Sequence, residues 1–146
     1  MATFVSSGLQ KQMLNSGGFK EVMDGSEFRI YSGIRPESAD NSIGAAVLLC
    51  VVKNGANGVS FDTETTPGVL LKPSAENWQG TNVASGTPSF YRLVKPNDTG
   101  EFSTAAPRVQ GDVGVVGADL NISSGSLVSG APQSINYYAV TLLPVA

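Results

Sequence analysis

Short runs of hydrophobic residues alternate along most of this chain with turns rich in glycine, proline and asparagine. Residues 87–94 form the clearest run, because aromatic and branched side chains occupy it and turn residues flank it on both sides. With a period of two residues, Phe90 and Val94 lie on one face of this segment, and Tyr91 and Leu93 lie on the other. Apolar side chains on both faces predict an interior β-strand.

The same pattern predicts further strands on both sides of this central one. Residues 27–32 alternate between apolar and polar, which is typical of a strand with one wet face. The apolar run at residues 45–52 predicts a fully buried strand, and an Asn-Gly turn joins it as a hairpin to a short return strand at 59–61. The remaining predicted strands are residues 68–72, 77–83, 108–113, 120–122, 127–128 and 134–143.

Eight to ten short strands with no helix between them predict an all-β protein. The spacing of the turns is typical of a single antiparallel β-sandwich of jelly-roll type, here with a short N-terminal helical arm. A parallel sheet is not expected, because no helical segment separates the strands. The chain of 146 residues fits one domain, and we assign residues 1–25 to the arm and residues 26–146 to the sandwich.

The arm has a helical pattern instead of a β pattern. Leu9, Met13 and Leu14 recur at helical spacing before a glycine-rich turn, and a second short helical turn follows at residues 19–23. Helices this short are marginal in water, so the arm must dock either on its own sandwich or on a neighbouring subunit. Removal of residues 1–18 is expected to weaken attachment to a partner and to leave the sandwich folded.

Ten apolar residues from these strands are expected to form the core: Phe28, Ile30, Leu48, Cys50, Val52, Phe90, Leu93, Leu120, Val140 and Leu142. Cys50 is the only cysteine, and its apolar surroundings favour a small buried hydrophobe over a reactive nucleophile. Trp78 is expected in the core. The alternative is that its ring forms an exposed surface on which a sugar stacks. Gly80 predicts a bulge or a close packing contact.

The composition indicates an unusually uncharged surface. Charged residues make up 14% of the chain, against about 25% in typical soluble proteins. Such a surface is poorly protected against association, so we expect a homo-oligomer, either a dimer or a trimer.

The net charge of −3 and the scattered cations, which we expect to be solvated, argue against nucleic-acid binding. With no apolar run longer than eight residues, neither a membrane span nor a secretory signal is expected.

The chain carries no recognisable catalytic constellation. It has no histidine, which excludes the usual serine or cysteine nucleophile paired with a histidine base. Asp112 and Asp119 are spaced to lie near each other in a sheet, but with Asp62, Glu64 and Asp98 they show no metal-binding spacing and are expected to be solvated loop acids. We therefore predict no enzyme activity, no cofactor and no metal site.

Several sequence blocks together carry a family resemblance that covers roughly Glu27 to Leu142. The blocks are Phe28-Arg29-Ile30-Tyr31-Ser32-Gly33, Pro36-Glu37-Ser38-Ala39-Asp40, Leu48-Leu49, Ala84-Ser85-Gly86, Phe90-Tyr91-Arg92-Leu93, Gly111-Asp112-Val113-Gly114 and Gly117-Ala118-Asp119-Leu120. In content and spacing the chain resembles small proteins of tailed bacteriophages and prophages that are similar to capsid cement, or decoration, proteins.

This resemblance implies a virion structural protein made in the cytoplasm of the host bacterium. It would bind the outside of the phage capsid and stabilise the junctions of the major capsid protein, which is the partner that we expect. The alternative is a carbohydrate-binding or host-surface-binding module of a phage tail or fibre. Candidate contacts with the capsid or with a neighbouring copy come from the arm and from two long loops: Phe4, Leu9, Met13, Leu14, Arg35, Glu37, Asp40, Asn97, Asp98 and Glu101.

Overall fold

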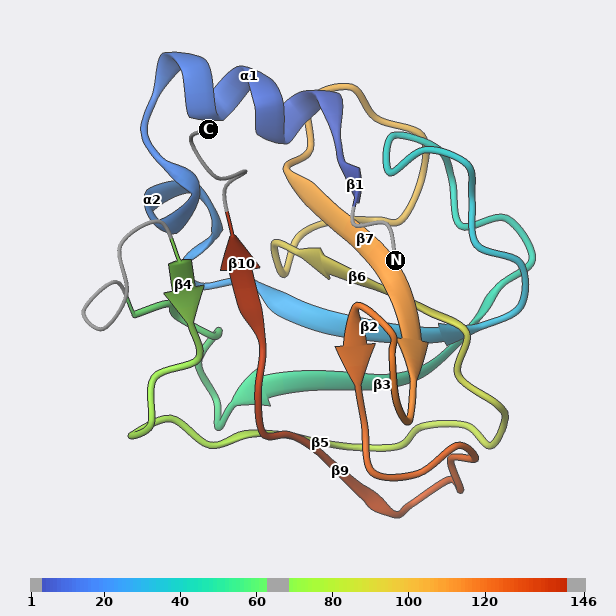
Figure 1. Cartoon of the computed structure of the whole chain (residues 1–146). Coiled ribbons are helices and arrows are strands. Elements are labelled where there is room, and N and C mark those ends of the chain that lie inside the picture. Colours follow the sequence, from blue (N-terminus) through green and yellow to red (C-terminus); the bar gives the residue numbers. More distant parts are fainter. Residues whose placement is uncertain (1–3, 63–68, 142–146) are drawn as a thin grey trace.

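A computed structural model describes residues 4–62 and 69–141 of the chain (Figure 1). Over these residues it contains two helices and ten strands. In chain order they are β1 (Phe4–Val5), α1 (Ser7–Asn15), α2 (Phe19–Met23), β2 (Glu27–Ser32), β3 (Val47–Asn54), β4 (Val69–Leu71), β5 (Trp78–Thr81), β6 (Phe90–Val94), β7 (Arg108–Gly114), β8 (Leu120–Asn121), β9 (Pro132–Ile135) and β10 (Ala139–Thr141).

Most of the strands belong to one large sheet. Seven of them follow the order β1-β7-β6-β2-β3-β5-β9 with antiparallel neighbours, and β8 adds an eighth strand by a short parallel pairing with β7. The strands β4 and β10 form a separate two-stranded sheet, which stands in front of the large sheet in Figure 1. The prediction of a mostly β protein is confirmed, and both described helices end by Met23, as expected.

The central strand was identified correctly from the sequence pattern. β6 lies between β2 and β7, and all five of its residues are buried. Tyr91 and Leu93 face the main hydrophobic core, whereas Phe90 and Arg92 face the opposite side of the sheet, where Phe90 stacks on Tyr31. Both sides of this strand are therefore covered.

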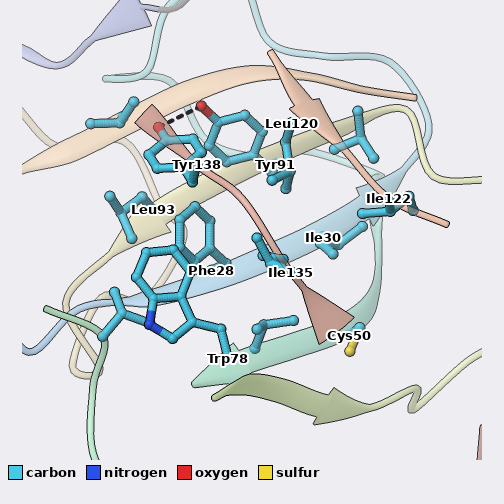
Figure 2. Close-up of a cluster of buried hydrophobic side chains, with 14 of the residues drawn as sticks. Phe28, Ile30, Cys50, Trp78, Tyr91, Leu93, Leu120, Ile122, Ile135 and Tyr138 are labelled. Carbon is cyan, nitrogen blue, oxygen red and sulfur yellow. Dashed lines mark hydrogen bonds between the residues drawn. The ribbon is translucent and has the colours of Figure 1, made fainter. Parts of the chain in front are cut away.

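An aromatic cluster occupies the space between the large sheet and the β4–β10 pair. Phe28 contacts the rings of Trp78, Tyr91 and Tyr138 at centroid distances of 4.9–5.8 Å. The hydroxyl groups of Tyr91 and Tyr138 are hydrogen-bonded at 2.8 Å, as Figure 2 shows. Trp78 is completely buried and donates its indole N–H to Glu76 Oε1 at 2.8 Å. The core position of Trp78 is confirmed, and its ring offers no surface for stacking a sugar.

The predicted core is confirmed at most positions and needs one correction. Leu48 is only partly buried, and Leu49 is fully buried in its place. The register of β3 against β2 shifts here, since Cys50 pairs with Ile30 but Leu48 pairs with Tyr31. This β-bulge turns two consecutive residues, Leu49 and Cys50, toward the interior. Val140 packs at the edge of the core, and Leu142 lies outside the described residues, as does Glu64.

The predicted hairpin between residues 45–52 and 59–61 is wrong. Both edges of β3 are already occupied, by β2 on one side and by β5 on the other. The chain does turn tightly at Asn54, but it then crosses to Ser26, whose carbonyl oxygen accepts a hydrogen bond from Val59 N–H at 2.8 Å.

The single C-terminal strand predicted at residues 134–143 is also wrong as one element. The region forms two strands, β9 and β10, which belong to different sheets. The turn between them places Tyr138 in the aromatic cluster and leaves Tyr137 exposed. Burial of the Tyr138 ring favours this turn over a continuous strand.

The N-terminal arm packs against its own chain. Ser6 caps α1 by accepting the Leu9 N–H at 3.1 Å, and β1 pairs with β7 at the edge of the large sheet. Leu9 is completely buried in the core, and Gly8 lies so close to the carbonyl of Ala105 that a Cβ atom would come within 2.4 Å of it. The arm and the sheet share one hydrophobic core. The domain boundary that we placed after residue 25 stays a prediction.

Candidate contact surface

Two long connections cover the side of the large sheet that faces away from the aromatic cluster. We call them the contact loops: residues 33–46, between β2 and β3, and residues 95–107, between β6 and β7. They are joined directly by backbone hydrogen bonds, from Ile43 N–H to Gly100 O at 3.0 Å and from Ser103 N–H to Asp40 O at 2.9 Å. Six of the ten sequence-predicted contact residues therefore lie on two loops that are joined to each other.

Arginine side chains hold these loops from beneath. Arg29, Arg92 and Gln110 are direct cross-strand neighbours on β2, β6 and β7, and Arg108 begins β7. Arg92 and Arg108 are each only 1% exposed. The expectation that the scattered cations are solvated is wrong for these two, because the contact loops fold over them and supply hydrogen-bond acceptors to both.

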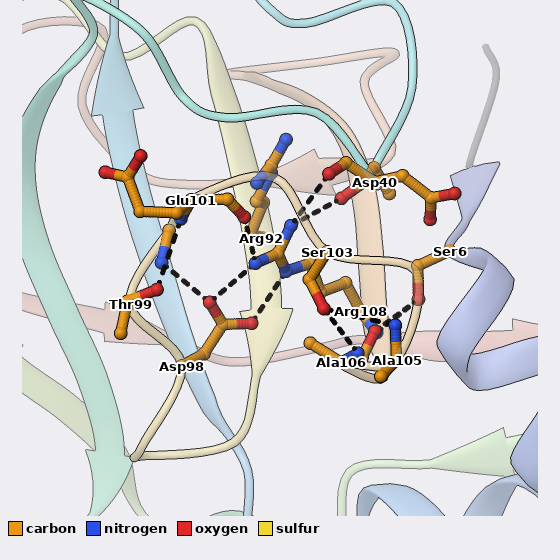
Figure 3. A network of polar contacts seen from close by, with 12 residues as sticks. Ser6, Asp40, Arg92, Asp98, Thr99, Glu101, Ser103, Ala105, Ala106 and Arg108 are labelled. Atoms are coloured by element: carbon orange, nitrogen blue, oxygen red, sulfur yellow. Dashed lines mark hydrogen bonds and ion pairs between the residues drawn. The ribbon is translucent and has the colours of Figure 1, made fainter.

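Arg108 makes the most complete set of contacts in this layer (Figure 3). It forms a bidentate ion pair with Asp98, Nε to Oδ2 at 2.7 Å and Nη2 to Oδ1 at 2.9 Å, in which the side chains are 1% and 2% exposed. It also donates to the carbonyl oxygens of Glu101 at 2.6 Å and Ala39 at 3.0 Å, one on each contact loop. A buried charge with all its donors satisfied fixes the loops in one arrangement.

The pKa of the Asp98 carboxyl is lowered by this environment. Burial by itself would raise the pKa, but hydrogen bonds from Arg108 and from the Gly100 N–H, together with the charge of Arg108, outweigh the loss of solvent. Asp98 is thus an internal counter-ion, and the exposed, solvated position predicted for it is wrong.

Arg92 and Arg29 anchor other parts of the loops. Arg92 donates to Asn41 O at 2.7 Å and to the side chain of Gln110 at 2.9 Å. Burial, followed by the nearby charge of Arg108, lowers the Arg92 pKa to about 10. Arg29 donates to the carbonyl oxygens of Asp98 and Pro96 at 2.7 and 3.2 Å.

The N-terminal arm is attached to the same layer. Asp40 accepts the Ser7 N–H at 2.7 Å and the Ser7 hydroxyl at 2.5 Å, at the start of α1. A carboxylate at this position satisfies a free helix N–H group and is favoured by the helix dipole. Asp40 therefore has a structural role in joining the loop to the helix.

The other predicted contact residues occupy different environments. Glu37, Asn97, Glu101 and Leu14 are exposed, Met13 is partly buried, and Leu9 is part of the core. The exposed residues stay predictions as contacts, whereas full burial removes Leu9 from any surface.

Phe4 and Arg35 meet at the rim of this surface. Arg35 lies over the Phe4 ring at 5.0 Å and forms an ion pair with Asp112 at 2.7 Å. The backbone N–H of Asp112 in turn donates to Asp119 Oδ2 at 3.0 Å, so the predicted proximity of these two acids is confirmed.

Two exposed apolar side chains of the contact loops were not singled out in the sequence. Ile34 is 90% exposed and Phe102 is 65% exposed. Ile34 also borders a shallow, mostly apolar hollow lined by Pro36, Ile43 and Ala46. The sequence carried little signal for them, because single exposed apolar side chains are common on protein surfaces.

No protein-family model, curated protein or solved structure matches this chain. Within residues 4–62 and 69–141, no three His, Cys, Asp or Glu side chains gather as a metal site would require. Neither helix in that part of the chain has the length and hydrophobicity of a membrane span.

Proposed function

We propose that this chain is a capsid decoration protein that binds the outside of a phage head through its contact loops and stabilises junctions of the major capsid protein. The observation that carries the proposal is the support given to these loops: buried Arg92 and Arg108 hold them, while Ile34 and Phe102 project from them. Exposed apolar anchors on a fixed backbone are what a protein interface uses, because little conformational entropy is lost on binding.

Binding energy alone is sufficient for this role. A partner that binds only the assembled lattice stabilises each site by about 2.7 kcal/mol at a hundredfold excess over Kd. Since a lattice repeats the same junction many times, modest contacts at each copy add up. The low fraction of charged residues, 14%, is consistent with a surface that other chains cover.

The finer architecture and assembly belong to the same proposal. We describe the fold as a jelly-roll sandwich, supported by the crossovers in the strand order β1-β7-β6-β2-β3-β5-β9 and by the β4–β10 pair facing that sheet. A dimeric or trimeric assembly on the capsid exterior is supported by the exposed apolar side chains of the loops.

The experiment is to add purified protein to phage heads that lack it and to measure occupancy and the temperature of DNA release. The wild-type chain is expected to bind heads and to raise that temperature. The double variant Ile34→Asp/Phe102→Asp is expected to lose both effects, because it places charges in the apolar contact.

Val128→Asp is the matched control, since Val128 is 61% exposed and lies outside the contact loops. It is expected to behave like the wild type. Equal loss of binding in both variants would contradict a specific role for the loops. Cryo-microscopy density for this chain only at the tail tip would overturn the capsid assignment in favour of a tail or fibre module.

A further inference from the structure

A second concave surface lies at the other end of the large sheet, away from β1 and β7. It is an open groove of about 400 Å³, which is within the size range of small-ligand sites. We call it the amide groove. Its lining residues come from the ends of β3, β5 and β9 and are Asn54, Gly55, Asn77, Gln79, Gly80, Thr81 and Pro132.

The lining of the amide groove carries neutral polar groups and no charged side chain. Four of its seven residues carry an amide or hydroxyl group, and Asn77, Gln79 and Thr81 are exposed. Each amide side chain offers donors and an acceptor, and each hydroxyl can act as either. Such a set can hydrogen-bond the neighbouring hydroxyl groups of a ligand, which are also both donors and acceptors.

The groove is built on strands and has little freedom to change shape. Gln79 is paired with Lys53 on one side and with Ser134 on the other. At Gly80 the two backbones are so close that a Cβ atom would lie 1.9 Å from Val51 O. Gly80 therefore serves the close packing predicted from the sequence, and it holds Gln79 and Thr81 in fixed positions.

This chemistry disfavours other classes of ligand. A protein partner would be expected to find a large apolar or aromatic anchor in the lining, and there is none among the seven residues. Nucleic acid or another polyanion would require cations, and none of the seven lining residues is charged.

An exposed aromatic residue follows β9, one of the strands that line the groove. Tyr137 is 67% exposed and follows Ile135 by two residues. Ile135, at the end of β9, pairs with Trp78, the residue that follows the lining residue Asn77. A tyrosine ring in such a place can cover the apolar face of a sugar while its hydroxyl stays in water.

We infer that the amide groove binds a neutral glycan. The inference does not depend on the capsid role, since it uses residues at the opposite end of the sheet from the contact loops. A copy attached through those loops would leave the groove open to solvent. If both sites function, a head-bound chain would also recognise sugars.

The test is a titration of the isotope-labelled, full-length protein followed by ¹H–¹⁵N NMR. The probes are maltose, lactose and N,N′-diacetylchitobiose, with sodium sulfate as a charged comparison. At least one disaccharide is expected to shift the backbone and side-chain amide signals of Asn54, Asn77 and Gln79. Sulfate is expected to leave those signals unchanged.

Variants separate the groove from the rest of the surface. Gln79→Ala and Tyr137→Ala are each expected to weaken disaccharide binding by about tenfold, as for the loss of one good polar or stacking contact. Asn97→Ala, an exposed change on a contact loop, is expected to bind normally.

Three results would overturn the inference. They are the absence of shifts with all three disaccharides, shifts confined to the contact loops, and disaccharide binding that Gln79→Ala and Tyr137→Ala leave intact. None of these results bears on head binding, so failure here is distinguishable from failure of the proposed function.

Discussion

The Asp98–Arg108 ion pair is the residue-level contact on which the contact loops depend most. Replacing Asp98 with asparagine keeps the shape of the side chain but leaves Arg108 buried without a counter-ion. We expect Asp98→Asn to lower the free energy of unfolding by about 3–5 kcal/mol, measured by urea denaturation. Glu37→Gln, an exposed change on the other loop, should cost less than about 0.5 kcal/mol. Similar losses in both variants would show that Asp98 is not a buried partner.

The same carboxyl predicts how stability depends on pH. Its folded-state pKa is below the ordinary value, so the unfolded chain takes up a proton first as the pH falls below about 4. The stabilisation is present above that value and is lost as the pH approaches the folded pKa. Urea midpoints measured at descending pH should fall in this range, and the fall should be smaller in Asp98→Asn. An identical pH profile in the two proteins would contradict this assignment.

Cys50 gives a prediction about reactivity. Burial raises the pKa of its thiol to about 11, and the side chain is completely inaccessible. A thiol reagent at about pH 8, near the ordinary thiol pKa, should therefore not modify the folded protein, because neither thiolate nor access is available. Modification should be rapid in denaturant. Fast reaction under native conditions would place Cys50 outside the core.

At this scale the sequence predicts apolar burial well and polar burial poorly. Cys50 and Trp78 were recognised because their apolar surroundings are local in sequence. The burial of Arg92 and Arg108 was missed because it depends on acceptors that distant loops bring to them, such as Asn41 O for Arg92, 51 residues away. The sequence did contain one indication that Arg92 is buried. Arg92 shares a strand face with Phe90 and Val94, in a segment already predicted to be interior.

Among the secondary-structure elements, α1 depends on a cap that also joins two parts of the chain. Ser6 Oγ accepts from Leu9 N–H and Arg108 N–H and donates to Ala106 O at 2.8 Å. Ser6→Ala removes the helix cap and leaves buried backbone groups unpaired, so we expect a loss of about 2 kcal/mol in thermal or urea unfolding. Ser16→Ala, at the exposed end of the same helix, is the control and should be nearly neutral. A neutral Ser6→Ala would show that water replaces the cap.

Element boundaries were predictable where a single alternation rule decides them. β2 has the predicted limits, and both helices end before Asp24 as expected. The hairpin after β3 failed because a turn signal does not reveal which strand edges are already occupied. The C-terminal strand failed because its apolar alternation continues through a bend, and only the position of the core shows that Tyr138 must turn inward.

For the whole molecule, the arm is expected to be a stabilising part of the fold. Leu9→Ala should cost about 2–5 kcal/mol as a core cavity, although sequence reasoning predicted a detachable arm. Leu14→Ala is a control in the same helix, where the side chain is 87% exposed, and it should change the unfolding temperature very little. If both variants melted like the parent, the arm would be dispensable to the fold. Deletion of residues 1–18 is accordingly expected to unfold the domain, and point variants are the better probes of attachment.

The pairing of β1 with β7 has a consequence for how the chain folds during synthesis. Ser6 reaches its partner Arg108 only after 102 further residues have been added, and Tyr138 must follow before the aromatic cluster closes. At translation rates of about 5–20 residues per second, the early hydrophobic segments wait several seconds for these partners. Such distant pairings also slow folding itself. The hydrophobic segments of the nascent chain therefore stay uncovered for that time, and we expect a prematurely terminated product to be prone to aggregation.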